Sequence, residues 1–314
     1  MKSKSKLTTL PKTIYLSLLF ISLAISSCSP TKSSIQKNGN KAYEFPYDWA
    51  NAKVHHLESQ LDEVSGLCFD MSTQNLIAVE DESGIIYFIN QEDGTTVKRD
   101  SVNKAGDYEG ITNTADYYYI LKSSGTIYQI DKNNLSAKPT KIKSYLNKNY
   151  DMEGLTYLKE KNALLVSAKA NPKELDQNQR NVFIYDIEKG EMNPEPFLVI
   201  KRSEIINIIQ QKYSAEYAAK NFQKILDVER AYLHLGPSGI AFQPKSRNMY
   251  VISSKSKLLL IYDTRTKTLL DVVKLDKSIM PQPEGICFDK KNNLYIASEA
   301  RTGNPHLIVI PPKK

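Results

Sequence analysis

Short runs of β-branched and aromatic residues, separated by polar turns, recur along most of the chain. Each set of runs begins just after a glycine, at intervals of 44, 44, 85 and 46 residues. These anchor glycines are Gly66, Gly110, Gly154, Gly239 and Gly285. Such runs are strand signals, and four antiparallel strands every ~45 residues is the period of a propeller blade. The sequence therefore predicts an all-β fold, a five-bladed β-propeller, with six blades as the alternative.

The 85-residue interval contains a segment with a different pattern. Residues 203–230, SEIINIIQQKYSAEYAAKNFQKILDVER, have helical spacing and neither glycine nor proline, and Ser203 is a residue type that caps helix N-termini. We interpret the segment as one or two helices inserted between the third and fourth blades. A degenerate sixth blade is the competing interpretation, but the alanines, glutamines and lysines of the segment favour helix over strand.

The last repeat ends after its third run, HLIVI, at residues 306–310. A spare run near the start, AKVHHLE at residues 52–58, can supply the outer strand of that blade and close the ring. Closure removes exposed sheet edges, which would otherwise invite aggregation. We therefore place the propeller domain at residues 46–314, after a polar tether at residues 29–45.

The first 28 residues are predicted to be a targeting segment and not part of the fold. Lysines precede an apolar run at residues 14–25, which is shorter than the roughly 20 residues that span a bilayer. This is the pattern of a secretory signal peptide. Its end, ISSC, resembles the bacterial lipobox, which implies cleavage before Cys28 and lipid attachment there. The alternative is an ordinary signal peptide with an incidental cysteine.

The same resemblance predicts where the protein is located. Ser29 follows the cysteine in place of an aspartate, and in lipoprotein sorting this implies an outer-membrane lipoprotein that faces the periplasm. Because several acyl chains anchor a protein firmly, the membrane is an expected partner through the lipid on Cys28. The formal net charge of +7 depends partly on the lysines of the leader, and no basic block with interleaved aromatics is present. Nucleic acid is therefore not an expected partner.

Familiar catalytic and metal motifs are missing from the chain. The four histidines show no metal-ligand spacing, and the sequence contains neither H-E-x-x-H nor C-x-x-C nor a glycine-rich phosphate loop. Cys68 and Cys287 occupy the same position in two repeats. Because small residues fill that position in the other repeats, we expect two buried packing residues and not a disulfide.

Acidic residues return at one place in successive repeats, three and one positions before the anchor glycine. Alternation of period two would direct both to one face. Polar residues that follow each second strand should reach the same rim, because that strand runs back antiparallel. The first set includes Glu63, Asp107, Glu109, Asp151, Glu153 and Glu284. The second set is Glu80, Asp81, Lys122, Lys169, Glu299 and Arg301.

Several carboxylates within a few ångströms cannot all ionise unopposed. Calcium takes about six to eight oxygen ligands, so an oxygen-rich ring suits it. The candidate calcium ligands are Asp107, Glu109, Asp151, Glu153 and Glu284. The candidate ligand-binding residues are Glu63, Glu80, Asp81, Lys122, Lys169, Glu299 and Arg301. Two alternatives stay open: the carboxylates accept hydrogen bonds that join neighbouring blades, or the two lysines supply the opposite charge.

The repeats resemble the SdiA-regulated domain family of bacterial envelope proteins. The resemblance is carried by EVSGLCFD, GDYEGI, DMEGLTY, GPSGIAFQP and PQPEGICFD, and it covers about residues 54–310. It implies a β-propeller, commonly a lipoprotein, and no settled reaction. A looser similarity to propeller phytases and calcium-dependent lactonases is an analogy of fold.

The expected function is that of a lipid-anchored periplasmic propeller that binds a small molecule or an envelope protein at its acidic rim, with calcium. One alternative is a calcium-dependent hydrolase of a phosphoester or a lactone, and the other is a structural envelope scaffold. No catalytic residue is assigned. We expect a monomer.

Overall fold

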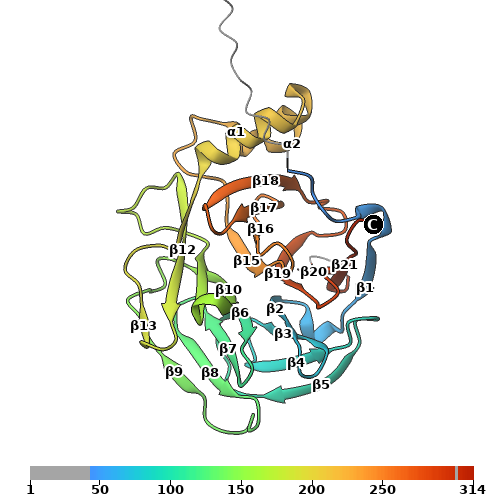
Figure 1. Ribbon diagram of the computed structural model, residues 1–314, viewed down its shortest axis with the longest axis vertical. Coiled ribbons are helices and arrows are strands. Elements are labelled where there is room, and N and C mark those ends of the chain that lie inside the picture. Colours follow the sequence, from blue (N-terminus) through green and yellow to red (C-terminus); the bar gives the residue numbers. More distant parts are fainter. Residues whose placement is uncertain (1–42, 301–302) are drawn as a thin grey trace, which may run out of the picture. The chain divides into compact units, whose positions relative to one another are not determined.

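The computed structural model describes residues 43–300 and 303–314. Within them, five antiparallel sheets surround a central axis, and two α-helices lie outside the ring (Figure 1). The predicted all-β, five-bladed propeller is thereby confirmed, and the six-bladed alternative is wrong. The signal peptide, Cys28 and residues 29–42 of the tether lie outside the described residues, as does Arg301.

Each blade is built from strands that follow one another outward from the axis. The first blade is β2 (Val64–Asp70), β3 (Asn75–Glu80), β4 (Ile85–Ile89) and β5 (Thr96–Ser101). The second is β6 (Tyr108–Asn113), β7 (Tyr117–Lys122), β8 (Ile127–Asp131) and β9 (Thr140–Ile142). The fourth is β15 (Pro237–Phe242), β16 (Met249–Ser253), β17 (Leu258–Asp263) and β18 (Thr268–Lys274).

The third blade has a divided outer edge. Its inner strands are β10 (Met152–Leu158), β11 (Ala163–Ala168) and β12 (Gln179–Asp186). The long strand β12 pairs at one end with β13 (Glu191–Met192) and at the other with β14 (Leu198–Lys201). Strand β14 leads directly into the first helix, so this blade is where the insertion leaves the ring.

The fifth blade is closed by the N-terminal strand, as the sequence predicted. It consists of β19 (Gln282–Phe288), β20 (Leu294–Glu299), β21 (His306–Ile310) and β1 (Lys53–His56). Strand β1 pairs antiparallel with β21, with Val54 opposite Ile308. The aromatic segment before β1 packs on the ring, where Tyr47 is 1% exposed and accepts a hydrogen bond from Gln243.

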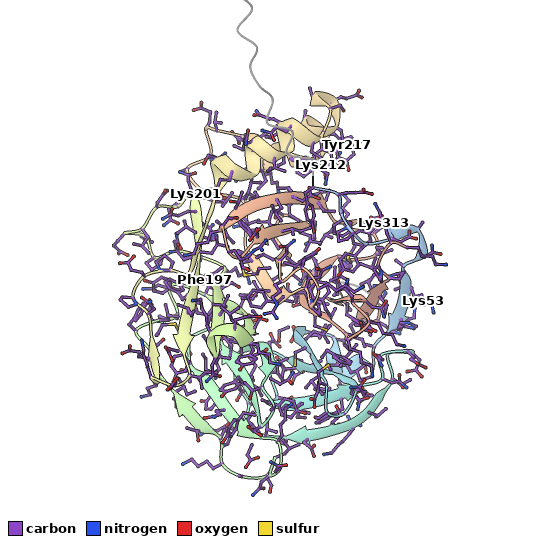
Figure 2. The ribbon with its side chains drawn as sticks, in the orientation of Figure 1. Lys53, Phe197, Lys201, Lys212, Tyr217 and Lys313 are labelled. Atoms are coloured by element: carbon purple, nitrogen blue, oxygen red, sulfur yellow. The ribbon has the colours of Figure 1, made fainter. Side chains whose placement is uncertain are left out.

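The predicted insertion forms two helices, α1 (Arg202–Lys212) and α2 (Ala215–Leu226), which pack beside β18 (Figure 1). Lys212, labelled in Figure 2, pairs with Asp271 of β18 at 2.6 Å. Ser203 lies inside α1, whose N-cap is Lys201, so the predicted capping role of Ser203 is wrong. Ser214 caps α2 instead, because its hydroxyl accepts the main-chain N–H of Tyr217. No helix of residues 43–300 and 303–314 has the length and hydropathy needed to span a bilayer.

The repeated glycine follows from how tightly the innermost strands pack around the axis. A Cβ added to Gly66 would lie 2.8 Å from Cα of Gly110 in the next blade. One added to Gly285, in the last blade, would lie 2.7 Å from Cβ of Leu67 in the first. Ordinary side chains do not fit at such separations. The glycine therefore recurs because each blade must approach the next one closely.

Candidate functional site

The polar residue just before each anchor glycine lies on a β-bulge. In β6 the pairing with β7 shifts between Tyr108 and Gly110, and the other four blades shift at the same place. A bulge adds one residue to a strand and redirects its side chain. The five bulge residues line one chamber on the axis of the ring. They are Ser65, Glu109, Glu153, Ser238 and Glu284.

This acidic chamber brings together three of the five predicted calcium ligands, Glu109, Glu153 and Glu284. It encloses about 10 Å³, which is roughly the space for one water molecule. The other two predicted ligands do not line it: Asp107 is exposed and accepts a hydrogen bond from Ser123, and Asp151 is half-buried with a φ of 52°. The bulge interrupts the period-two alternation on which that part of the prediction depended.

Two serines join neighbouring blades in this chamber. The Ser65 hydroxyl donates to the main-chain oxygen of Tyr108 at 2.6 Å and so links the first blade to the second. The Ser238 hydroxyl donates to that of Pro283 at 2.7 Å and links the fourth blade to the fifth. The serines therefore staple two pairs of neighbouring blades, and a hydrogen bond between Glu284 and Ser254 also joins the fifth blade to the fourth.

The chamber contains one counter-charge for three buried carboxyl groups. Nζ of Lys169, on the loop after β11, lies 2.5 Å from Oε1 of Glu153. Burial alone would lower the pKa of Lys169, but Glu153 outweighs that effect and raises it. Burial raises the pKa of Glu153 to about 7 against the pull of the lysine.

The pKa values of the other two glutamates are also raised. Burial, reinforced by the negative charge of Glu153, raises the pKa of Glu109 to about 10 and that of Glu284 well above its usual range. Glu284 is 6% exposed, and its Oε2 is buried without a hydrogen-bond partner among the described residues. The chamber is thus a compact cluster of acids whose pKa values are all raised, and one oxygen of Glu284 in it has no hydrogen-bond partner among the described residues.

A second group of acidic residues lies at the rim, around the end of β3. One carboxylate oxygen from each of Glu63, Asp81 and Glu82 lies within 4.8 Å of the others, and no other group of three potential ligands converges in this way in the described part of the chain. Burial, followed by the charge of Glu63, raises the pKa of Asp81 to about 7. Oδ1 of Asp81 is buried and has no partner among residues 43–300 and 303–314. We call these three residues the rim triad.

Glu82 of the rim triad was not among the predicted residues. Its signal in the sequence is the acidic run Glu80–Asp81–Glu82 at the end of β3, of which only the first two residues were selected. The carboxylate of Glu80 accepts the main-chain N–H groups of Glu82 and Ser83, each at 2.8 Å. Glu80 therefore shapes the loop that carries the triad, and its oxygens already have partners.

The other predicted rim residues have separate surroundings. Glu299 accepts a hydrogen bond from Gln282, and burial, then the charge of Glu63, raises its pKa. Lys122 lies over the ring of Tyr108, 5.2 Å from its centroid. Glu299 therefore borders the rim triad. The two predicted lysines have different partners: Lys169 pairs with the buried Glu153, and Lys122 lies over the ring of Tyr108.

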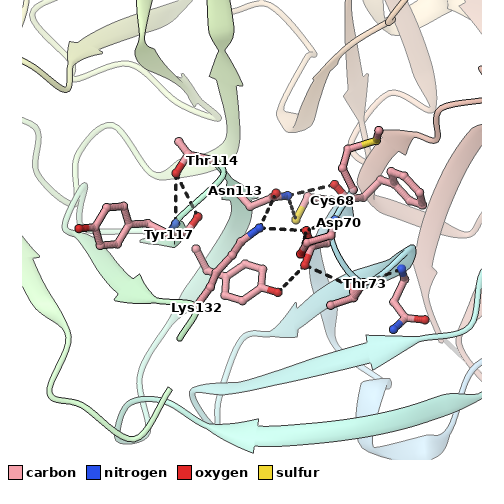
Figure 3. A network of polar contacts seen from close by, with 12 residues as sticks. Cys68, Asp70, Thr73, Asn113, Thr114, Tyr117 and Lys132 are labelled. Atoms are coloured by element: carbon pink, nitrogen blue, oxygen red, sulfur yellow. Dashed lines mark hydrogen bonds and ion pairs between the residues drawn. The ribbon is translucent and has the colours of Figure 1, made fainter. Parts of the chain in front are cut away.

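A large cavity lies on the other side of the anchor glycines, and it was not predicted from the sequence. It encloses about 630 Å³ and is lined by residues of all five innermost strands. One wall contains an ion pair, in which Nζ of Lys132 lies 2.9 Å from Oδ1 of Asp70 and 3.0 Å from Oδ1 of Asn113 (Figure 3). Cys68 and Cys287, also in the wall, are free buried thiols, as expected.

Comparisons with known proteins agree with this architecture. The family model described as SdiA-regulated matches residues 41–302. No curated protein matches the sequence significantly. A glutaminyl cyclase from Myxococcus xanthus is similar at a TM-score of 0.52 and 12% identity, over 83% of this chain and 96% of that one. A gluconolactonase from Xanthomonas campestris is similar at a TM-score of 0.46 and 13% identity, over 87% and 96%. At 12% identity, the likeness to the glutaminyl cyclase concerns the fold alone.

Proposed function

The chain belongs to the SdiA-regulated family, and from that premise we propose that it is a binding protein that uses its acidic rim. In this proposal a lipid on Cys28 holds it in the outer membrane facing the periplasm, and the rim takes calcium together with a small molecule or an envelope protein. The observation that carries the proposal is the rim triad: three convergent carboxylates, one of them with a buried oxygen that has no partner.

The rim triad fits calcium better than the acidic chamber does. Its donors are all carboxylate oxygens, which hard cations prefer, and the exposed Glu63 leaves room for water to complete the coordination. In the chamber, Lys169 already neutralises Glu153, and no three carboxylates converge within 4.8 Å. Bound calcium would neutralise the triad and leave positions open for an oxygen-bearing ligand.

The residues of this chain then have distinct tasks. Asp81 supplies the buried oxygen, while Glu63 and Glu82 flank it. Glu80 holds the loop by accepting two of its N–H groups, so we consider it a positioning residue. Glu299, whose pKa is raised by burial and by Glu63, extends the acidic surface toward the fifth blade.

Calcium binding is tested by thermal unfolding and calorimetry of the purified full-length protein in detergent. We expect calcium to raise the unfolding temperature more than equimolar magnesium does, because calcium accepts irregular oxygen coordination whereas magnesium demands a near-ideal octahedral site. Asp81→Asn should weaken calcium binding by about tenfold or more. Glu188→Gln, at an exposed turn, is the matched control and should bind as the wild type does.

Three outcomes would overturn this proposal. Calcium without effect on the wild type, or Asp81→Asn that binds as tightly as the wild type, would remove the metal from the rim. Turnover of a lactone or phosphoester that calcium supports and Asp81→Asn abolishes would replace the binding protein with the hydrolase alternative.

The anchor needs a separate experiment. We expect cells fed a radiolabelled fatty acid to incorporate it into the wild type and not into Cys28→Ser. Cys68→Ser, which changes a thiol of the propeller, is the matched control and should remain labelled. Equal labelling of the wild type and Cys28→Ser would contradict lipid attachment at that residue.

A further inference from the structure

The cavity beyond the anchor glycines exists because of a regular choice of residue size. The second residue after each anchor glycine is small in every blade, and all five line the cavity. They are Cys68, Thr112, Thr156, Ala241 and Cys287. The third residue is larger and usually aromatic, as in Phe69, Phe242 and Phe288. Small side chains near the axis, with aromatic ones beyond them, leave a bowl of about 630 Å³.

An aliphatic layer separates this cavity from the acidic chamber. It is formed by the residue directly after each anchor glycine, which borders both spaces. The layer consists of Leu67, Ile111, Leu155, Ile240 and Ile286, and none is more than 4% exposed. A ligand in the cavity therefore meets hydrocarbon below it and does not reach the chamber carboxyl groups.

The ion pair of the wall and the amide beside it already have hydrogen-bond partners. Asp70, 1% exposed, accepts from Lys132 at 2.9 Å and from the Tyr118 hydroxyl at 2.7 Å. The Asn113 amide accepts from Lys132 and donates to the main-chain oxygen of Phe69 at 3.0 Å (Figure 3). The only other charged residue of the wall, Lys159, is exposed to solvent. A charged guest would therefore lose its hydration without gaining a buried partner.

We propose that this cavity is a second binding site, separate from the acidic rim, and that it takes one uncharged, mainly apolar small molecule. Its volume lies within the range of about 300–1,000 Å³ that is usual for small-molecule sites. The hydroxyls of Thr112 and Thr156 offer the guest a limited number of hydrogen bonds on the wall. The aromatic residues that line the cavity favour a flat ring system.

The test uses three naphthalene compounds of matched shape: 2-naphthalenemethanol, 2-naphthoate and 2-naphthylmethylammonium. Saturation-transfer NMR on the full-length protein in detergent, with a calcium chelator present, compares the wild type with Ala241→Leu and Ala241→Ser. Ala241→Leu fills the bowl, whereas Ala241→Ser keeps its size, and both variants share the same detergent background. We expect the alcohol to bind the wild type and Ala241→Ser, and to bind Ala241→Leu about tenfold more weakly or worse.

The same experiment can overturn the proposal. An alcohol signal that is equal on the wild type and on Ala241→Leu would show binding to the detergent or to another surface. Binding of the naphthoate or the ammonium compound as strong as that of the alcohol would show that the site is not selective for uncharged guests. If Ala241→Leu does not fold, Thr156→Leu fills the same bowl from the third blade and gives the same two outcomes.

Discussion

The acidic chamber and the apolar bowl lie at the two ends of the innermost strands, and the same repeat builds them in opposite ways. On one side, the residue before the anchor glycine is a serine or a glutamate, and three carboxyl groups line a chamber of about 10 Å³. On the other side, the residue two positions after the glycine is small, and an apolar bowl of about 630 Å³ results. In each innermost strand, the residue that lines the small acidic chamber and the residue that lines the large apolar bowl are therefore only three positions apart.

The two ends also hold their charges differently. Asp70 in the apolar end has its own lysine and tyrosine, and these partners outweigh burial, which alone would raise its pKa, and lower it to about 2. The three chamber glutamates share Lys169, and burial raises the pKa of each of them. A buried carboxyl group thus stays ionised only where a dedicated donor faces it.

The largest effect should come from the glycine ring that both ends share. In Gly239→Ala the new methyl group would overlap the main-chain oxygen of Glu284 in the next blade. We expect the free energy of unfolding to fall by about 3 kcal/mol, measured by urea denaturation. The matched control is Gly236→Ala, whose methyl group meets the flexible Lys169 side chain at 3.1 Å and should cost less than about 1 kcal/mol. Equal losses in both variants would mean that close approach of the blades is not what requires glycine.

A smaller loss of stability is expected from removing one charge in the wall of the apolar bowl. Lys132→Met leaves Asp70 buried without its cation, which should cost about 3 kcal/mol or somewhat less in the free energy of unfolding. Adding Asp70→Asn should recover part of that loss, because no buried charge then remains. Lys122→Met at the acidic end removes only a contact with Tyr108, and we expect it to cost less than about 1 kcal/mol. Similar losses for the two single lysine variants would contradict the difference between the ends.

The smallest effect is the response of the two ends to pH. The pKa of Asp70 is lower in the folded protein than its ordinary 3.8, so its contribution is complete above about pH 4 and is lost as the pH falls toward about 2. The chamber acts in the opposite direction. The pKa of Glu109 and of Glu284 is raised above 4.5, so the unfolded chain releases protons that the folded one retains, and stability falls as the pH rises above about 5.

Glu284→Gln separates these two contributions. The neutral amide removes part of the alkaline loss, so we expect this variant to be more stable than the wild type near pH 9 by about 1 kcal/mol. Near pH 3 its decline should match that of the wild type, because Asp70 is unchanged. Urea denaturation at a series of pH values measures the free energy of unfolding on the acidic and the alkaline side. If that free energy falls as steeply with rising pH in Glu284→Gln as in the wild type, the explanation is wrong.

The blades, the closing strand and the helical insertion were predictable from the sequence, because each depends on local periodicity. Strand runs repeat with period two between polar turns, and residues 203–230 have helical spacing. The recurring interval between glycines then supplied the number of blades. That Glu109, Glu153 and Glu284 would meet also followed from the repeat, since equivalent positions of a closed ring face one axis.

Only the tertiary structure decided which of the repeated residues share a site. The bulge before each anchor glycine breaks the alternation, so Asp107 and Asp151 do not line the chamber with Glu109 and Glu153. The three residues of the rim triad lie beside the start of β2 and the end of β3 in the first blade, 18 and 19 residues apart in the sequence, and converge only in the folded chain. The apolar bowl depends on side chains from all five blades, whose spacing around the axis is not specified by any one repeat. The local sequence pattern determines the strands and helices of this protein. The cavities and the contacts between distant side chains form only when five sheets pack around one axis, because their size depends on how all five blades fit together.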